Sequence, residues 1–425
     1  MVNNKKKLLI LTVFFFIGTS SYSQTSASLA LTLPQAENLF LKENYQLIAQ
    51  KFETDQANTD IITAKLFNNP EISYENQFFN NDTKKFFQTS RVQGQYAAEI
   101  SQIIRLAGKR NKSILLANSN VRLTEYQYFD LMRTLKFELS STFYKAYYQQ
   151  ESAKIYDQQI KALHVLLKAN EEQVKMGNIA VKDVIRIKSL LYGLQGEYSK
   201  LMNDNEDLQT QIKLLTNIKP DVKLVLATDV DQQRNDLEKQ IYSNLLDSAK
   251  NNRADLKLAL TAITSAENNL SLQKANAIPD VEFSMNYDYK GNYPDKYIGI
   301  GIKLPIPLFN RNQGEIKKAR IAITAGQSIL NQQQVLLENE VYNAYTSAMR
   351  TENLYKSLDQ NFSTDFQKLI EEVVKNFKNR NISLIEFLDF YDSYKSNVLQ
   401  MNELGYERMN ARQEINYVTG STIFK

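Results

Sequence analysis

The hydrophobic and polar residues of this chain follow two different periods. Within residues 113–174, apolar side chains recur at alternating steps of three and four without an intervening glycine or proline, and residues 313–377 show the same apolar spacing. This spacing predicts α-helices with one apolar stripe, and its persistence predicts coiled-coil packing. A helix over residues 113–174 would be about 90 Å long at ~1.5 Å per residue, which exceeds the size of a small globular domain.

Each of these long helices is followed by a partner helix. Short polar turns lie at residues 176–178 and 378–381, and a second helical pattern then covers residues 181–217 and 383–418. The sequence therefore predicts two helical hairpins, over about residues 113–217 and 313–418. A shorter helix is predicted ahead of the strands in each half, over residues 34–67 and about 253–277, and each stops before a proline.

Strict alternation of apolar and polar residues separates the short helix from the hairpin in each half. It predicts strands at about residues 70–79, 91–104, 279–290 and 296–306. In the third of these strands, polar residues separate the apolar positions Val281, Phe283, Met285, Tyr287 and Tyr289. Each strand is therefore expected to have one apolar and one polar face.

The order of helix, strand pair and hairpin occurs twice, which indicates an internal duplication. We expect a first repeat at residues 24–217, a linker at 218–252, a second repeat at 253–418 and a tail at 419–425. Residues 1–23 contain a lysine cluster, a short apolar run and small residues, which is typical of a signal peptide.

Composition narrows the possible chemistry. The chain has no cysteine, one histidine and a formal net charge of +4, which falls further if a signal peptide with three lysines is removed. The histidine, His164, lies in a helical stripe without a second ligand at metal-binding spacing, so we expect a structural role. We expect no catalytic residues, no metal site, no cofactor and no nucleic-acid partner.

The two-faced strands have two interpretations. They could form a small antiparallel sheet packed on helices, or part of an outer-membrane barrel with lipid on one side and a wet lumen on the other. Four strands cannot close a membrane barrel, so the second interpretation requires several copies of the chain. Two copies would supply about 8 strands and three about 12, and the pattern alone does not choose between them.

The duplicated arrangement resembles the TolC family of outer-membrane efflux proteins, chiefly through the helix-turn segments 177–184 and 385–389. The motif Gly108-Lys109-Arg110 and residues 304–314 are similar to the heavy-metal (cobalt-zinc-cadmium, CzcC-like) branch. The resemblance implies a mostly α fold with a β-barrel part: a homotrimer with a 12-stranded barrel in outer-membrane lipid and a periplasmic α-barrel of coiled-coil helices. The partners implied are a periplasmic adaptor (membrane fusion) protein and an inner-membrane pump of the RND type.

The same resemblance implies a passive, non-enzymatic exit duct with functional residues near the hairpin tips. Glu386 and Asp389 match a ring of acids at the pore constriction, where they would attract cations, although an exposed acidic helix face would look the same. Asp183 matches an acid of the gate. Phe377 stands in place of a tyrosine and Ile382 in place of a frequent arginine, so apolar packing could replace polar gate contacts.

Two further groups of residues follow from the resemblance. The helix-tip turns that would contact the adaptor contain Gly177, Asn178, Arg380 and Asn381. Bends between strands and helices are expected at Pro70, Pro279, Pro305 and Pro307, where proline is also ordinary at strand ends. The loops at residues 79–90 and 290–296 would face the outside of the cell.

The sequence does not identify the cargo of such a duct. The CzcC-like motifs suggest heavy-metal cations, but the duct of a drug-efflux or type I secretion system would have the same pattern. A periplasmic coiled-coil scaffold with a small sheet is the structural alternative. An enzyme is the remaining one, for which the sequence offers only scattered acids.

Overall fold

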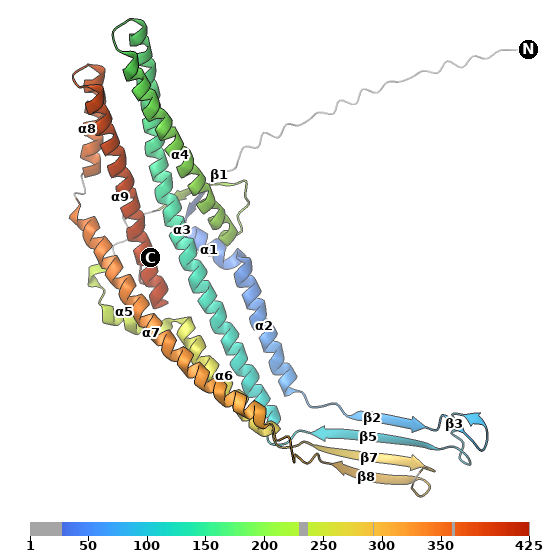
Figure 1. Cartoon of the computed structure of the whole chain (residues 1–425). Helices are drawn as coiled ribbons and strands as arrows, with labels where there is room; N and C mark the ends of the chain where they lie inside the picture. The colour runs from blue at the N-terminus through green and yellow to red at the C-terminus, as the bar shows by residue number, and fades with distance from the viewer. Residues whose placement is uncertain (1–27, 229–236, 292, 359–361, 425) are drawn as a thin grey trace, which may run out of the picture.

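The computed structural model describes residues 28–228, 237–291, 293–358 and 362–424. The signal peptide predicted at residues 1–23 lies outside the described residues. Figure 1 shows an elongated bundle of helices with a four-stranded sheet that projects sideways from one end. The predicted combination of long helices and four strands is confirmed. Among the described helices, none is both long and apolar enough to span a membrane.

The helices follow the duplicated order of the sequence. Those of the first half are α1 (Leu33–Glu43), α2 (Tyr45–Lys65), α3 (Lys109–Lys175) and α4 (Val181–Thr216). Those of the second half are α5 (Tyr242–Asn252), α6 (Ala254–Asn276), α7 (Gln313–Ser357), α8 (Phe362–Lys378) and α9 (Leu384–Thr419).

The helix predicted over residues 34–67 is divided in two at Asn44, so the expectation of one continuous helix was wrong. Asn44 is buried, and its side chain accepts a hydrogen bond from the Leu47 backbone N–H at 3.0 Å. It also donates to the Leu215 carbonyl at 3.0 Å. Asparagine favours such capping positions because its side chain competes with the helical backbone bonds.

The long helix expected over residues 313–377 is also divided, whereas α3 runs unbroken for 67 residues. α7 ends at Ser357, and Leu358 adopts an extended conformation. The Ser357 hydroxyl donates to the Leu354 carbonyl at 2.7 Å, and the Leu358 N–H turns to the Tyr355 carbonyl at 3.4 Å. The Ser357 hydroxyl thus occupies the Leu354 carbonyl, which would accept the Leu358 N–H if the helix continued.

The main sheet is antiparallel with the order β2-β5-β7-β8. Its strands are β2 (Glu71–Asn76), β5 (Tyr96–Ile104), β7 (Val281–Tyr289) and β8 (Tyr297–Lys303). Each strand is shorter than predicted, β5 at its start only and the other three at both ends. Residues 91–93 form a turn, and β8 ends before Pro305, which has no N–H to donate to a ladder.

Two small strand pairs were not predicted. A short hairpin follows β2 and consists of β3 (Phe79–Asn80) and β4 (Lys85–Phe86). β1 (Ser28–Thr32) pairs in parallel with β6 (Lys223–Ala227), which lies in the segment expected to be a linker. That segment also contains α5 and a short 3₁₀ helix, η2 (Leu237–Lys239).

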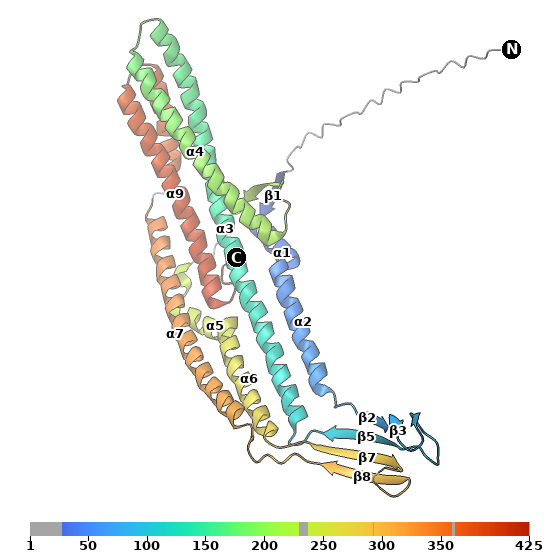
Figure 2. The ribbon, with the colours of Figure 1, turned by 45° about the vertical axis from the view of Figure 1, so that its right-hand side comes forward.

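The helices next to the sheet lie side by side in the same order as the strands to which they connect. α3 packs between α2 and α6, and α6 packs against α7, so the four helices nearest the sheet repeat the sequence β2-β5-β7-β8 (Figures 1 and 2). Towards the other end, α4, α3, α9 and α8 form a second row. Three apolar cores hold this wall together: one around α1 and the middle of α3, one around α5 and α7, and one near the hairpin tips.

Candidate functional site

The main sheet separates apolar and polar residues onto opposite faces. The strand register aligns Ile72, Ile100, Met285 and Ile300 in one apolar row across all four strands. Large apolar side chains on this face are exposed, up to 79% for Ile72 and 84% for Ile300. A face of this kind is unstable in water and must be covered by another molecule or by lipid.

The opposite face is polar and mainly acidic. One row joins Glu71, Ser101, Ser284 and Gly301, and the next joins Ser73, Glu99, Asn286 and Gly299. The carboxylates of this face are Glu71, Glu75, Glu99, Glu282 and Asp288. The Nζ of Lys303 lies 3.3 Å from the Glu282 carboxylate and neutralises that acid. The polar face suits contact with water.

Tyrosines gather at the end of the apolar face that lies farthest from the helices. Tyr96 and Tyr289 stack with ring centroids 5.1 Å apart, and Tyr74 and Tyr287 lie 6.3 and 6.2 Å from Tyr96. Tyrosine combines an apolar ring with a polar tip, so it is favoured at a boundary between lipid and water.

A partly buried ion pair joins the two halves where the sheet meets the helices. The Nζ of Lys109 lies 2.7 Å from the Asp280 carboxylate, which also accepts the Leu106 N–H at 2.9 Å. The neighbouring Arg110 donates to the Lys65 carbonyl at 2.8 Å and lies over the Phe67 ring. The Gly108-Lys109-Arg110 motif therefore connects α3 to the segments before β2 and β7.

The four prolines singled out from the sequence lie in these connections. Pro70 directly precedes β2, and Pro279 lies between α6 and β7. Pro305 and Pro307 lie between β8 and α7. Each is outside a strand, where the missing N–H leaves no gap in the ladder.

The far ends of the two hairpins lie side by side and enclose a cavity of about 500 Å³. It brings together three residues predicted to form a gate, Asp183, Phe377 and Ile382. Asp183 is half-buried at the third position of α4, and the other two come from the opposite hairpin. The tip-turn residues Asn178 and Arg380 line the same cavity.

An aromatic column fills the space beneath this cavity. Phe377 stacks on Phe387 at 4.7 Å between ring centroids, and Phe387 stacks on Tyr391 at 5.4 Å. The buried Tyr391 hydroxyl donates to the Gln159 carbonyl on α3 at 2.9 Å, and burial raises the pKa of Tyr391. Sequence reasoning missed Phe387 and Tyr391, although their spacing of four residues on one helix was a usable signal.

The two predicted ring acids, Glu386 and Asp389, are exposed at the start of α9. Glu386 also completes a capping box: its carboxylate accepts the Ser383 N–H at 2.8 Å, and the Ser383 hydroxyl accepts the Glu386 N–H at 3.2 Å. These hydrogen bonds from Ser383 lower the pKa of Glu386. In the first hairpin, Ala180 is the N-cap residue of α4, so the helix that carries Asp183 has no side-chain cap.

The tip turns are linked through Gln173. Its side-chain oxygen accepts hydrogen bonds from Asn178 and from Arg380 of the other hairpin, each at 2.9 Å. Arg380 has a φ of 61°, a left-handed conformation that the first turn gives to Gly177. In the second turn, Asn381 bonds Asn376 at 3.2 Å, which is an exposed contact within one hairpin.

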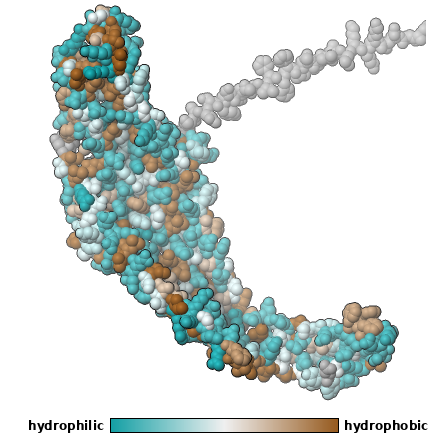
Figure 3. Space-filling model, viewed as in Figure 1, coloured by the Kyte–Doolittle hydropathy of each residue, from teal (hydrophilic) through white to brown (hydrophobic). Residues whose placement is uncertain are grey.

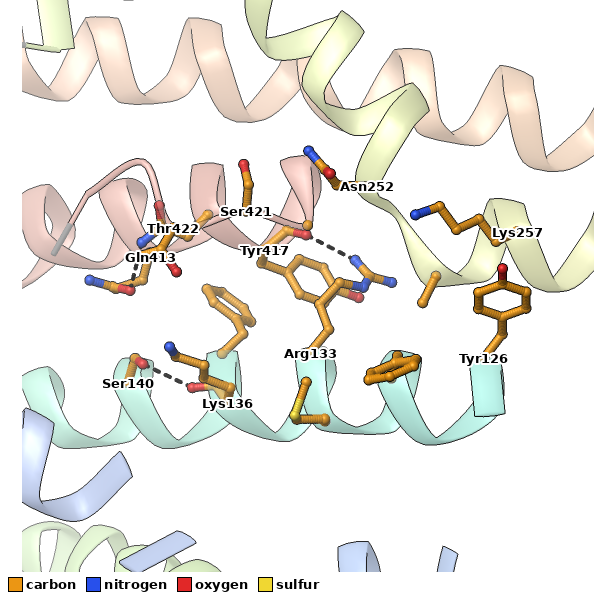
Figure 4. Close-up of a pocket in the computed structure, with 16 residues that line it drawn as sticks. Tyr126, Arg133, Lys136, Ser140, Asn252, Lys257, Gln413, Tyr417, Ser421 and Thr422 are labelled. Atoms are coloured by element: carbon orange, nitrogen blue, oxygen red, sulfur yellow. Dashed lines mark hydrogen bonds between the residues drawn. The ribbon is translucent and has the colours of Figure 1, made fainter. Parts of the chain in front are cut away.

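A second cavity of about 420 Å³ lies halfway along the wall between α3, α6 and α9 (Figure 4). Arg133 lies over the Tyr417 ring at 4.2 Å and donates to the Tyr417 carbonyl at 3.0 Å. Arg133 also bonds Asp130 and reaches Asp255. Arg133, the guanidinium at this cavity, is therefore already paired with acids. Sequence reasoning did not find the cavity.

A buried ionic network surrounds the break between α5 and α6. Arg253 is 1% exposed and forms ion pairs with Asp255 and Glu340. Burial opposes the ionisation of Asp255, but hydrogen bonding and charge from Arg253 outweigh it and lower the pKa of Asp255. A second network, between Glu352, Arg408 and Arg412, lies between α7 and α9. Within the described residues, no group of histidines and acids is arranged to hold a metal ion.

Comparisons with known proteins agree with this geometry. Residues 245–374 match the family model of outer membrane efflux proteins. The cobalt-zinc-cadmium resistance protein CzcC of Cupriavidus metallidurans is 23% identical over 68% of this chain, and the match spans 66% of the relative's length. The Campylobacter jejuni CmeC outer membrane channel has a similar fold, with a TM-score of 0.71 and 15% identity over 91% of this chain and 85% of that one. CusC superposes with a TM-score of 0.73 and 15% identity over 92% of both chains.

Proposed function

The chain belongs to the outer membrane efflux protein family, and on this premise we propose that three copies of it form the exit duct of a tripartite efflux system. The single observation that carries the proposal is the four-stranded sheet with one exposed apolar face, one acidic face and two unpaired edges, β2 and β8. In lipid, unpaired strand edges are too costly to persist, so the sheet must close through further copies.

Three copies supply about 12 strands, which leave a water-filled lumen, whereas about eight strands leave an interior that side chains fill. The apolar rows then face lipid and the carboxylate rows line the lumen. The chain is an outer-membrane protein, and its helices extend into the periplasm. Because the helices follow the order of the strands, closing the barrel also closes the helical wall.

Exposed apolar residues on the outer helices support this lateral contact. They lie on α2 at one side of the wall and on α7 at the other, and each is more than half exposed: Tyr45, Phe52, Ile62, Ile321, Ile329, Val335 and Tyr342. A neighbouring copy would cover them in the same way that α3 and α6 cover the inner faces of these helices.

The hairpin tips form the gate of this duct. Phe377 and Ile382 hold the tip closed by apolar packing on Phe387, next to Asp183. In a trimer, Glu386 and Asp389 supply a ring of carboxylates at the constriction, which attracts cations. The turns between α3 and α4 and between α8 and α9 lie at the far end of the helices from the sheet (Figure 1), and an adaptor protein docks there. These turns contain Gly177, Asn178, Arg380 and Asn381.

The pump behind the duct is an inner-membrane RND-type transporter, and its cargo is divalent metal cations. The name of the relative CzcC, a cobalt-zinc-cadmium resistance protein, supports this choice, and so does the acidic lumen face. A duct for drug efflux or type I secretion is the second candidate, and it would show the same sheet and hairpins. Deletion of the gene, followed by growth on zinc, cobalt and cadmium or on drugs, separates the two.

Chemical cross-linking tests the assembly directly, because the chain contains no native cysteine. Ile300→Cys on one sheet edge is combined with Ile72→Cys or Tyr74→Cys on the other. We expect disulfide-linked trimers in outer-membrane fractions for at least one pair, and ion conductance in planar bilayers. A soluble monomer without conductance would overturn the proposal and favour a periplasmic scaffold.

A further inference from the structure

The hairpin between β2 and β5 exposes an unusual group of phenylalanines. We call residues 77–90 the Phe hairpin. Phe78, Phe86 and Phe87 are each at least 60% exposed, and the Phe78 ring contacts the rings of Phe86 and Phe87 at 5.3 and 5.2 Å between centroids. Phe79 contacts Phe86 at 4.9 Å. Figure 3 shows an apolar patch over this hairpin, at the end of the sheet farthest from the helices.

The backbone of the Phe hairpin is held in a conformation that favours this exposure. Phe87 has a φ of 48°, which is a true outlier for a bulky residue, and Lys84 has a φ of 54°. The Asn80 side chain fixes the turn by accepting the N–H groups of Asp82 and Thr83. A strained aromatic residue on the surface indicates a requirement beyond folding, since a relaxed loop would bury or replace it.

Basic side chains surround the aromatic patch. Lys84, Lys85 and Arg91 are all exposed, and Asp82 is the one acid within residues 77–95. Aromatic rings with flanking lysines are the composition of surfaces that lie at the boundary between lipid and water. The four tyrosines described above lie at this end of the apolar sheet face, so the patch continues a surface suited to lipid.

We propose that the Phe hairpin is a lipid anchor that binds the anionic headgroup layer of the outer leaflet, with its phenylalanines in the interface and Lys84 and Lys85 on the phosphates. The proposal rests on the proposed function, which places this end of the sheet at the outer membrane surface. The alternative to lipid is that loop 290–296 of a neighbouring copy covers the phenylalanines. That loop contains Lys290, Lys296 and one acid, Asp295, so its net charge would repel the two lysines.

The absence of native tryptophan makes the test direct, since one substitution gives one fluorescent probe. The trimer carrying Phe86→Trp is placed in vesicles of phosphatidylcholine and phosphatidylglycerol that contain nitroxide-labelled lipid. We expect blue-shifted emission and loss of most of it when the nitroxide is near the headgroup, with less loss when it is deep in the acyl chains. Phe78→Trp repeats the measurement in case Phe86→Trp misfolds.

Ile300→Trp and Tyr192→Trp are the matched controls. Ile300 lies on the apolar sheet face and should be quenched by the deep label, whereas Tyr192 is exposed on α4 and should be quenched by neither label. If Ile300→Trp escapes lipid quenching, the proposed membrane barrel fails. If Ile300→Trp is quenched and both hairpin probes are not, the barrel stands and the anchor is wrong. Quenching by aqueous iodide would then indicate that the hairpin is exposed to water. The absence of iodide quenching would indicate that the next copy covers it.

The charge requirement is tested in the Phe86→Trp background. Lys84→Glu with Lys85→Glu should lower the preference of the hairpin for phosphatidylglycerol over phosphatidylcholine roughly 25-fold or more, since each lysine near an anionic surface contributes about a fivefold preference. Lys168→Glu with Lys200→Glu makes the same change in net charge on exposed positions of α3 and α4. An equal effect of both pairs, or of neither, would overturn the role of the two lysines.

Discussion

The two hairpins have the same plan but are connected to the sheet differently. In the first, α3 is one unbroken helix from the sheet to the tip. In the second, α7 ends at Ser357, and α8 begins separately at Phe362 and packs chiefly against α9. Two halves with the same order of elements thus contain one hairpin that is continuous with the sheet and one that is not. The second is therefore the better candidate for the moving part of a gate.

The same contrast occurs where each half turns from its first helix into its second. The break at Asn44 is held by a neutral side chain with two backbone hydrogen bonds. The break at Arg253 is held by a buried guanidinium between two carboxylates. The stability of the first break therefore depends on neutral hydrogen bonds, and that of the second on buried ion pairs. Substitutions can measure the two contributions separately.

The largest effect is expected at these breaks. Arg253→Ala leaves Asp255 and Glu340 without their buried partner and should lower the free energy of unfolding by about 3–5 kcal/mol. Asn44→Ala should lower it by about 1–2 kcal/mol through loss of the cap and one buried hydrogen bond. Denaturant unfolding followed by circular dichroism measures both. Equal losses would show that the two breaks are energetically equivalent.

The tip offers the next comparison. Phe377→Ala removes the stacking on Phe387 and should destabilise the closed tip by about 1–3 kcal/mol, which raises the basal conductance in planar bilayers. Val174 occupies the corresponding place in the first hairpin and is also half-buried. Val174→Ala should change the conductance little. A closed state unaltered by Phe377→Ala would count against the apolar gate.

The share of the structure that could be predicted from the sequence differs between the two ends of the molecule. The period of two located all four strands of the sheet, because their apolar face meets no other part of the chain. The helix break at Asn44 could not be predicted, because it depends on the Leu215 carbonyl, which is distant in sequence. Asp183 and Phe377 were proposed as gate residues through motif resemblance, and the structure places both at one cavity. The helical spacing of Phe387 and Tyr391 could have indicated their stacking, but the hydrogen bond from Tyr391 to Gln159 on another helix could not be predicted.

Acid should also distinguish the two breaks. The lowered pKa of Asp255 means that its ion pair contributes fully above the ordinary aspartate range, and that this stability is lost as pH falls through the lowered value. Asp255→Asn should therefore flatten the fall in unfolding free energy below about pH 4. Asn44→Ala should keep the wild-type pH dependence, because that break contains no titrating group. An unchanged slope in Asp255→Asn would assign the acid sensitivity to other carboxylates with a lowered pKa, such as the buried Glu352.

The capping box at Glu386 predicts a smaller, pH-dependent effect on ion flow. Glu386→Gln with Asp389→Asn should weaken the block of single-channel current by divalent cations. Ser383→Ala removes the side-chain hydrogen bond but keeps the backbone N–H that bonds the Glu386 carboxylate, so the block should stay intact at neutral pH. As the pH is lowered, the block should be lost at a slightly higher pH than in the wild type, because one of the two hydrogen bonds that lower the pKa of Glu386 is gone. Asp183→Asn, which alters the uncapped acid of the first hairpin, is the control. If the block survives neutralisation of both ring acids, they form only an exposed helix face.

The smallest effect concerns the turn in which Arg380 replaces the glycine of the first hairpin. Arg380→Gly removes the hydrogen bond to Gln173 but also relieves a left-handed residue, and each change amounts to about 1 kcal/mol. We therefore expect the unfolding free energy to change little. Gln173→Ala removes the acceptor of both tip bonds without relieving the backbone, so it should destabilise the tip by about 0.5–1 kcal/mol. A clear stabilisation in Arg380→Gly would show that the bond between the hairpins contributes nothing. A destabilisation equal to that of Gln173→Ala would show instead that the strain is negligible and that the side chain of Arg380 holds the two tips together.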